Sequence, residues 1–264
     1  MMKRRTITLY DKKKHIMPVF QLPTEILFPD PEFAEPDGLL AVGGDLSCER
    51  LIEAYTQGIF PWYSDGEPLL WWSPAPRLIL LPEEFHLPRR LARTMRKKTF
   101  TISADTDFAE VIAQCGQTRI RSGEGTWITD EMKAAYIRLH ELGYAHSIEC
   151  RQENTLVGGL YGVCIDRVFF GESMFSRVSD ASKVALATLV TLCRKKKIEM
   201  IDCQMTTAHL LKFGAREVSR PWFRQRLTIL ARKRLGQKKW RLEGNDKEEE
   251  VVSTGACREG EEQH

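Results

Sequence analysis

Three consecutive β-rich runs restrict the possible folds more than any other feature of this sequence. They lie at residues 145–151, 155–165 and 167–175, and only the short polar turns RQEN and ID separate them. Runs that follow one another this closely are typical of antiparallel neighbours joined by hairpins. We therefore predict a three-stranded antiparallel meander.

The segments after the meander add helices and one more strand. We predict a capped helix at 179–197, a strand at 199–205, a short helix at 207–214 and a further helix from about Arg220 to Leu235. This order predicts an α/β (α+β) protein with a mixed, largely antiparallel sheet that carries helices on its faces.

Two more helices are expected before the meander. Ser47 is predicted to cap the first, which ends at Gly58, and Thr129 to cap the second, which ends at Gly143. Their buried faces consist of Leu51, Ile52 and Tyr55 in the first helix and of Met132, Ala135, Tyr136 and Leu139 in the second. We also expect short strands at 69–72, 78–81 and 99–104, a helix at 108–115 and a loop at 118–129.

The predicted domain organisation has four parts. With 264 residues and 42% hydrophobic content, the chain can bury one large core or two modest ones. Because the sequence pattern changes near Pro76, we expect a small N-terminal domain at 26–76 and a main domain at 77–240. A basic N-terminal extension at 1–25 and an acidic, disordered tail at 241–264 flank them.

The charge is unevenly distributed along the chain. From Glu243 onward there are eight acidic and two basic residues, which gives −6, so the overall charge of +3 leaves +9 on residues 1–242. The densest basic run contains six positive charges within residues 89–98, namely Arg89, Arg90, Arg93, Arg96, Lys97 and Lys98. With Leu91 and Met95 as its inward stripe, this run is either a solvated helix face or a contact for a phosphate-bearing partner.

Nothing in the sequence indicates a membrane, a metal or a disulfide. No run approaches eighteen apolar residues, and the N-terminus lacks the apolar stretch of a secretory signal. The seven cysteines form no C-x-x-C pair and no set with metal-ligand spacing. We expect a cytoplasmic monomer with free thiols, no bound metal and no membrane contact.

Tryptophans are concentrated in one short stretch. Trp62, Trp71 and Trp72 lie within eleven residues interrupted by prolines and glycine. Such rings either form a corner of the core or a platform for a flat ligand. Alternation along a strand puts Trp71 and Trp72 on opposite faces, so at least one of them is expected in the core.

The strand EMIDCQM combines apolar and polar residues. Side chains alternate between the faces of a strand, so Asp202 and Gln204 are predicted to share one face and Ile201 and Cys203 the other. The polar pair either caps a neighbouring element or belongs to a site. Cys203 is disfavoured as a nucleophile because it points away from that pair and has no histidine nearby in sequence.

A second unusual carboxylate lies in the run FFGESMF. Glu172 is surrounded in sequence by Phe169, Phe170, Met174 and Phe175. It is either an outward-facing residue on an edge strand or a functional group. Gly171 beside it permits a β-bulge or a close backbone approach to a ligand.

Several motifs together resemble a known family. GLLAVGGDLS, GIFPWYS, LWWSPAPR, EGTWIT, LHELGYAHSIE, LVGGLYGV, GESMFSR, ASKVAL and IDCQ occur in the order seen in bacterial leucyl/phenylalanyl-tRNA–protein transferases, and the resemblance runs from about Phe28 to Arg226. It implies an enzyme that moves Leu or Phe, and sometimes Met, from aminoacyl-tRNA to the α-amine of proteins beginning with Arg or Lys, which marks them for N-end rule degradation. It also implies that the main domain is of the GNAT acetyltransferase type.

The resemblance implies roles for individual residues. Trp62 and Trp127 hold the 3′-terminal adenosine between them. Gln204 contacts the attacking amine, Asp202 polarises or orients the Gln204 amide, and Glu172 helps to place the reacting ends. The six basic residues of the run at 89–98 are candidates for contacting the tRNA backbone. The aminoacyl side-chain pocket corresponds to Leu160, Phe169, Met174, Leu189 and Ile201.

Three positions depart from the familiar family pattern. Leu160 stands where Met is familiar, Leu189 where Phe is, and Thr207 where Asn is. The first two leave the preference between Leu and Phe open. The acetyl-CoA pyrophosphate loop of GNAT enzymes is also absent between Met174 and Ala185, so no coenzyme A or other cofactor is expected.

Two other functions remain as alternatives. A non-catalytic RNA-binding module would explain the basic surface and the tryptophans, but it gives no reason for the polar pair beneath an apolar slot. An acetyltransferase of the same fold is disfavoured by the missing pyrophosphate loop.

Overall fold

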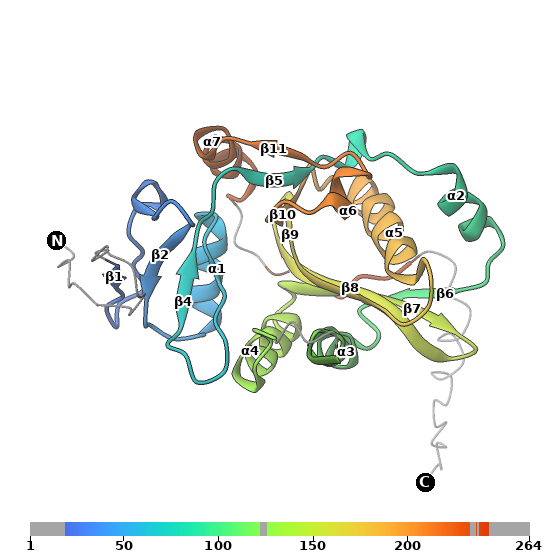
Figure 1. Ribbon diagram of the computed structural model, residues 1–264, viewed down its shortest axis with the longest axis horizontal. Coiled ribbons are helices and arrows are strands. Elements are labelled where there is room, and N and C mark those ends of the chain that lie inside the picture. The colour runs from blue at the N-terminus through green and yellow to red at the C-terminus, as the bar shows by residue number, and fades with distance from the viewer. Residues whose placement is uncertain (1–18, 122–125, 233–235, 237, 243–264) are drawn as a thin grey trace, which may run out of the picture.

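The computed structural model describes residues 19–121, 126–232, 236 and 238–242. Within these residues the strands form a four-stranded sheet in the order β1-β2-β4-β3 and a seven-stranded sheet in the order β11-β5-β10-β9-β8-β7-β6 (Figure 1). The first sheet comprises β1 (Phe20–Gln21), β2 (Leu39–Val42), β3 (Phe60–Pro61) and β4 (Leu70–Trp72). The second comprises β5 (Arg77–Leu80), β6 (Thr101–Ala104), β7 (Ala145–Gln152), β8 (Thr155–Ile165), β9 (Val168–Ser176), β10 (Met200–Gln204) and β11 (Arg216–Val218).

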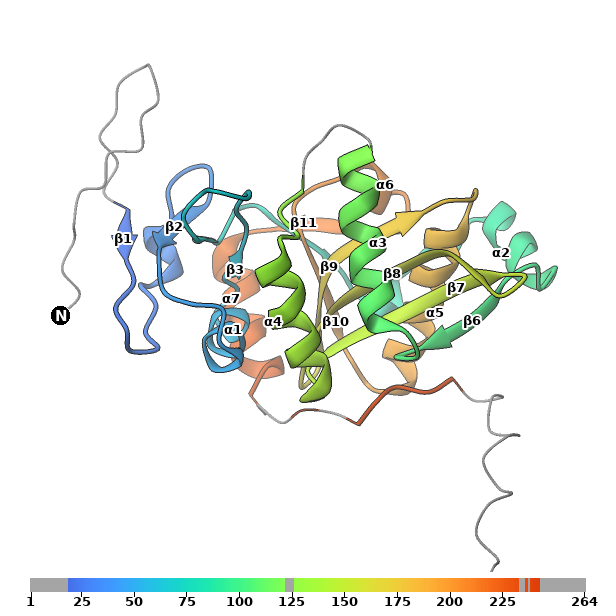
Figure 2. The same ribbon diagram turned by 90° about the horizontal axis from the view of Figure 1, so that it is seen from below.

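Helices cover both faces of the larger sheet. The α-helices are α1 (Cys48–Thr56), α2 (Arg89–Arg96), α3 (Phe108–Arg121), α4 (Asp130–Glu141), α5 (Ala181–Lys195), α6 (Ala208–Leu211) and α7 (Arg220–Leu230), and short 3₁₀ turns lie at Pro31–Phe33 and Pro82–Glu84. Helices α3 and α4 pack side by side on one face of the sheet, and α5 packs on the other (Figures 1 and 2). The predicted fold class is therefore confirmed.

The meander is present as predicted. Strands β7, β8 and β9 pair antiparallel, whereas β10 pairs parallel with β9 and antiparallel with β5. The parallel pairing follows from the connection, because α5 carries the chain back across the sheet between β9 and β10.

Two helices begin at the caps that the sequence predicts, whereas α5, also predicted to be capped, has Asp180 at its N-cap without a side-chain cap hydrogen bond. Ser47 Oγ accepts a hydrogen bond from the Arg50 backbone N–H at 3.4 Å, and Thr129 Oγ1 accepts one from that of Met132 at 3.2 Å. Each satisfies a donor that the first turn of a helix leaves unpaired.

Two helix ends differ from the sequence prediction. Helix α3 continues to Arg121, so the first four residues of the predicted loop at 118–129 are helical. Gly116 lies inside this helix, although glycine disfavours helix, and a Cβ at this position would make an ordinary van der Waals contact with Ile128 at 3.6 Å. Helix α7 ends at Leu230 rather than near Leu235, and 233–235 lie outside the described residues.

The change of sheet falls at the predicted domain boundary. Strand β4 belongs to the four-stranded sheet and β5 to the seven-stranded one, with Pro76 between them. However, one cluster of buried residues joins Leu51 and Trp71 to Tyr136 and Phe170, so the two sheets share a core. The division into domains stays a prediction.

Other sequence predictions concern surface and termini. The six cysteines within the described residues are free, while Cys257, residues 1–18 of the basic extension and the tail from 243 lie outside them. Among the described helices, none is long and apolar enough to span a lipid bilayer.

Candidate active site

An apolar cavity of about 450 Å³ opens between the two sheets. Its walls come from β3, β8, β9, α5, β10 and α6, and from the segment that contains Trp127. All five positions predicted for the aminoacyl side chain line it, namely Leu160, Phe169, Met174, Leu189 and Ile201. So do Trp62, Trp127, Glu172 and Gln204.

Strand register assembles the apolar wall. Leu160 on β8 lies opposite Met174 on β9, and Phe169 on β9 lies beside Ile201 on β10. Paired residues project to the same face of a sheet, so these side chains form a continuous surface. Leu189 on α5 covers it, because α5 packs on this face.

Two β-bulges turn polar residues toward the cavity. On β9, Ser173 pairs with Tyr161 and Gly171 with Gly162, which leaves Glu172 as the extra residue. Of the two possibilities that Gly171 permits, the strand adopts the bulge. A bulge bends a strand and redirects a side chain.

The second bulge lies on the neighbouring strand β10. Asp202 pairs with Ile79 and Gln204 with Leu78, which leaves Cys203 as the extra residue. Gln204 has a φ of 60°, in the left-handed region that side-chain-bearing residues rarely adopt. Alternation is therefore interrupted between Asp202 and Gln204.

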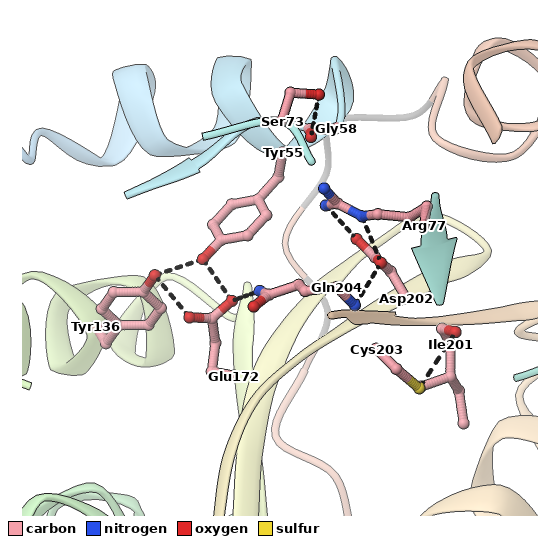
Figure 3. A network of polar contacts seen from close by, with 10 residues as sticks. All are labelled: Tyr55, Gly58, Ser73, Arg77, Tyr136, Glu172, Ile201, Asp202, Cys203 and Gln204. Atoms are coloured by element: carbon pink, nitrogen blue, oxygen red, sulfur yellow. Dashed lines mark hydrogen bonds and ion pairs between the residues drawn. The ribbon is translucent and has the colours of Figure 1, made fainter. Parts of the chain in front are cut away.

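Glu172 and Gln204 meet in a buried polar network (Figure 3). Gln204 Nε2 donates to Glu172 Oε1 at 2.8 Å, and Tyr55 Oη donates to the same oxygen at 2.7 Å. Tyr136 Oη donates to Glu172 Oε2 at 3.1 Å, and the two tyrosine hydroxyls contact each other. The tyrosines come from α1 and α4, so both flanking helices fix the carboxyl group.

The contacts within this network favour the protonated form of Glu172. Three oxygen–oxygen contacts join Tyr55, Tyr136 and Glu172, but the two hydroxyls supply only two protons. A protonated Glu172 supplies the third and allows every contact to be a hydrogen bond. Burial raises the pKa of Glu172 from 4.5 to about 7, even though hydrogen bonds from Tyr55, Tyr136 and Gln204 act in the opposite direction. This carboxyl group can therefore take up and release a proton near neutral pH.

The structure corrects the predicted contact between Asp202 and the Gln204 amide. The Asp202 carboxylate receives Arg77 Nε at 2.8 Å and Arg77 Nη2 at 2.7 Å, and it accepts from the Gln204 backbone N–H at 2.9 Å. The Gln204 side-chain amide instead reaches Glu172 (Figure 3). The predicted contact came from the family resemblance, whereas the strand bulges at Cys203 and the Gln204 side chain reaches Glu172.

Arg77 and Asp202 form a buried ion pair. Both side chains are at most 1% exposed, and the guanidinium carbon lies 4.9 Å and 4.8 Å from the ring centroids of Phe60 and Phe223. Asp202 does not line the cavity. Its carboxylate is connected to the site by the hydrogen bond from the Gln204 backbone N–H.

Cys203 does not have the properties of a nucleophile. Cys203 lines the cavity, its Sγ contacts the Ile201 carbonyl oxygen at 3.9 Å, and it packs against the apolar cluster that forms the cavity wall. Burial raises the pKa of this thiol far above its ordinary value. It stays a neutral thiol near pH 7.

The tryptophans gather at one side of the cavity. Trp62 and Trp127, 65 positions apart, have ring centroids 5.9 Å apart and an interplanar angle of 82°. The predicted pair is brought together, but the rings meet edge to face and leave no parallel gap for a base. Trp72 Nε1 donates to the Trp62 carbonyl oxygen at 2.7 Å, whereas Trp71 is fully buried, as expected of a core residue.

The basic run forms helix α2 and its C-terminal end. Leu91 is buried and Met95 partly buried, while all six basic residues predicted for tRNA contact are exposed. We call these six residues the α2 basic face. Helix α2 packs against α5, which also lines the cavity.

Sequence reasoning missed three residues of the site. Tyr55 and Tyr136 were assigned only to apolar helix faces, and Arg77 received no role. A buried tyrosine hydroxyl needs a hydrogen-bond partner, so two tyrosines on inward helix faces were a usable signal. Among the described residues, no group of His, Cys, Asp and Glu side chains could hold a metal ion.

Comparisons with known proteins agree closely with one another. A family model described as leucyl/phenylalanyl-tRNA protein transferase matches residues 79–228, and a model of the N-terminal domain of that protein matches residues 44–75. A leucyl/phenylalanyl-tRNA–protein transferase from Desulfatibacillum aliphaticivorans is 56% identical over 78% of this chain and 89% of its own length.

Other relatives carry the same name. The protein from Syntrophobacter fumaroxidans is 56% identical over 81% of this chain and 91% of its own length. The one from Desulfotalea psychrophila is 53% identical over 86% of this chain and all of its own length. Among solved structures, FemX aligns with a TM-score of 0.45 at 10% identity over 65% of this chain and 66% of FemX.

Proposed function

This chain belongs to the leucyl/phenylalanyl-tRNA–protein transferase family, and from that premise we propose which acceptors it uses and how its site works. The acceptors are proteins with N-terminal Arg or Lys, and Met is a further donor beside Leu and Phe. The family resemblance suggests these acceptors, and the observation that carries the proposed transfer reaction is one cavity lined by an apolar slot, two tryptophans and the Glu172–Gln204 pair. A non-catalytic RNA-binding module would need only the tryptophans and the α2 basic face.

One donor molecule contacts both ends of the cavity, with its aminoacyl side chain at one end and its terminal adenine at the other. The aminoacyl side chain enters the slot formed by Leu160 and the four other apolar positions, and the terminal adenine stacks on Trp62 and Trp127. One of these rings rotates from the edge-to-face arrangement so that the base meets two parallel faces. Stacking of a base on an aromatic ring contributes about 1–3 kcal/mol.

The chemistry is aminolysis of an ester that is already activated. The acceptor nitrogen attacks the ester carbonyl carbon, a C–N bond forms, and the bond to the ribose oxygen breaks. A free α-amine has a pKa of about 8, so a useful fraction is neutral at pH 7 and a modest base suffices. Holding the acceptor amine close to the ester carbonyl carbon supplies most of the rate acceleration that this reaction requires.

Glu172 is the base in this proposal. Because its pKa is raised to about 7, the carboxylate accepts the proton that the attacking amine loses and then returns a proton to the departing ribose oxygen. The Tyr55 and Tyr136 hydroxyls hold the carboxyl group during both steps. Gln204 orients the amine with its side-chain carbonyl while its Nε2 remains bonded to Glu172.

Asp202 acts as a positioning residue. It holds the Gln204 backbone N–H, and Arg77 holds Asp202. This replaces the direct contact with the Gln204 amide that the sequence suggested.

The shape of the slot selects the donor. Leu, Phe and Met are unbranched at Cβ, whereas Val and Ile would crowd its mouth. The α2 basic face contacts tRNA phosphates without reading sequence. In the cell, the added residue marks the acceptor for N-end rule degradation in the cytoplasm. We further propose a monomer with a small domain at 26–76 and a GNAT-type domain at 77–240.

The test is direct. The protein is incubated with charged leucyl-tRNA and peptides that begin with Arg, Lys or Ala, and N-terminal extension is followed by mass spectrometry. Arg and Lys peptides should gain one Leu, whereas the Ala peptide and an N-acetylated Arg peptide should not. Acetyl-CoA should modify none of them. Equal extension of the Ala peptide would overturn the proposed acceptor specificity.

A further inference from the structure

Trp240 is buried although it lies beyond the last predicted helix. It follows α7 by ten residues, is 1% exposed, and belongs to the apolar cluster that includes the cavity wall. The family models match residues 44–75 and 79–228, so they do not reach it.

Three contacts fix the indole. The Trp240 backbone N–H donates to Asp105 Oδ2 at 2.6 Å, and the same carboxylate oxygen contacts His146 Nδ1 at 2.7 Å. The His146 ring stacks on the Trp240 ring with centroids 4.1 Å apart and an interplanar angle of 8°. Lys196 Nζ lies 5.4 Å from the same ring centroid. The position of Trp240 is therefore set by the sheet and not by chance packing of a chain end.

The indole stands directly behind one wall of the cavity. Trp240 and Phe169 have ring centroids 5.8 Å apart, and Phe169 lines the cavity whereas Trp240 does not. His146, beneath Trp240, pairs with Gly162 on the next strand. A Cβ on Gly162 would lie 2.6 Å from two atoms of the Phe169 ring, so that ring occupies the space above Gly162. The two rings thus lie side by side over paired residues of β7 and β8.

We propose that Trp240 is a specificity-determining residue that fixes the depth of the aminoacyl slot by holding Phe169 in place. Phe169 has the Gly162 backbone below it and the indole behind it, so it cannot withdraw from the cavity. A smaller residue at 240 lets the Phe169 ring move back, and the slot becomes deeper. The deeper slot favours the longer Phe side chain over Leu. This inference rests on the proposed function, in which the cavity receives the aminoacyl side chain.

The measurement is the ratio of kcat/KM for Phe-tRNA to that for Leu-tRNA, with an Arg-starting peptide as acceptor. Trp240→Leu should raise this ratio by about tenfold or more, which is the range that small changes in an apolar pocket produce. Trp240→Phe leaves a smaller gap and should raise it in the same direction by less. A purely structural role would lower both rates together and leave the ratio unchanged.

Two control variants separate the possible outcomes. Trp222 on α7 packs against the other apolar cluster, beside Arg216 and Arg226, so Trp222→Leu should lower the melting temperature without changing the ratio. Leu189→Ala enlarges the slot directly and should change the ratio if the cavity binds the aminoacyl group.

Each result then decides one question. A changed ratio in Leu189→Ala with a parental ratio in Trp240→Leu overturns the inference and leaves the proposed function standing. If the Phe-to-Leu ratio stays parental in both Leu189→Ala and Trp240→Leu, the cavity does not bind the aminoacyl side chain. If Trp240→Leu does not fold, a folded Trp240→Phe with a parental ratio overturns the inference.

Discussion

The Arg77–Asp202 pair offers the sharpest test of how the site is held together. Arg77→Met removes the cation and leaves a buried carboxylate that keeps only the Gln204 backbone N–H as donor. Removing one partner of a buried ion pair costs about 3–5 kcal/mol. For a chain of this size that loss lowers the melting temperature by roughly 6–20 °C.

The single variant Asp202→Leu should affect the rate through Gln204, because it removes the acceptor of the Gln204 backbone N–H. A left-handed φ costs a side-chain-bearing residue about 1–2 kcal/mol, whereas a hydrogen bond to a charged group contributes about 1.5–3 kcal/mol. With the Asp202 carboxylate in place, the bond outweighs the strain and Gln204 keeps its φ of 60°. Without it, Gln204 relaxes and its amide leaves Glu172. A displacement of about 1 Å in a reacting group can lower the rate about 10²-fold.

The double variant Arg77→Met/Asp202→Leu separates the two effects. Apolar replacement of a buried ion pair is often neutral for stability, so the melting temperature should return toward the parental value. The rate should stay as low as in Asp202→Leu alone, because Leu cannot accept the Gln204 backbone N–H. The assay compares kcat with leucyl-tRNA against the melting temperature for the parent, both single variants and the double variant. Recovery of both stability and kcat in the double variant would refute the positioning role of Asp202.

The remaining predictions concern donor binding and proton transfer. Trp62→Ala and Trp127→Ala should each weaken binding of aminoacyl-adenosine and of aminoacyl-tRNA by roughly 5- to 150-fold, as about 1–3 kcal/mol of stacking implies, and unchanged analogue affinity in both would exclude a stacking site. Replacing several residues of the α2 basic face with Gln should raise KM for charged tRNA and flatten its salt dependence, yet spare aminoacyl-adenosine; equal losses with both donors would point to misfolding. Because burial raises the pKa of Glu172 to about 7 and the carboxylate is the proposed base, parental kcat should rise with pH around 7, and Glu172→Gln should lower kcat and remove that rise. The pKa of Glu172 is higher in the folded protein than its ordinary 4.5, so ionisation of Glu172 should lower the stability of the parent progressively between about pH 4.5 and 7. The melting temperature of Glu172→Gln relative to that of the parent should therefore rise across this range and then level off.

Much of the fold was predictable because it rests on local patterns. The β-rich runs at 145–175 became β7, β8 and β9, and the caps Ser47 and Thr129 start their helices where expected. The apolar slot was also predictable as a set of positions, and the structure brings all five into one cavity. Errors occurred at helix ends, as in α3, which continues through Gly116 to Arg121.

The polar part of the site was predicted less well. The sequence identified Glu172, Asp202 and Gln204 as unusual, and the resemblance supplied Trp62 and Trp127. It assigned the wrong contact to Asp202, since a bulge at Cys203 cannot be inferred from alternation within a single strand. A bulge depends on how two strands pair, which is decided by residues far away in the chain.

The sequence by itself determined which segments form strands and helices, where the helices begin, and which family the chain resembles. Those features depend on spacing, capping and motifs within short stretches. Only the tertiary structure decided what each polar group does. Tyr55 reaches Glu172 across 117 positions, and Arg77 reaches Asp202 across 125. A buried polar group must find its hydrogen-bond partner in the folded core, and the proton count and the raised pKa of Glu172 follow from those partners and from burial.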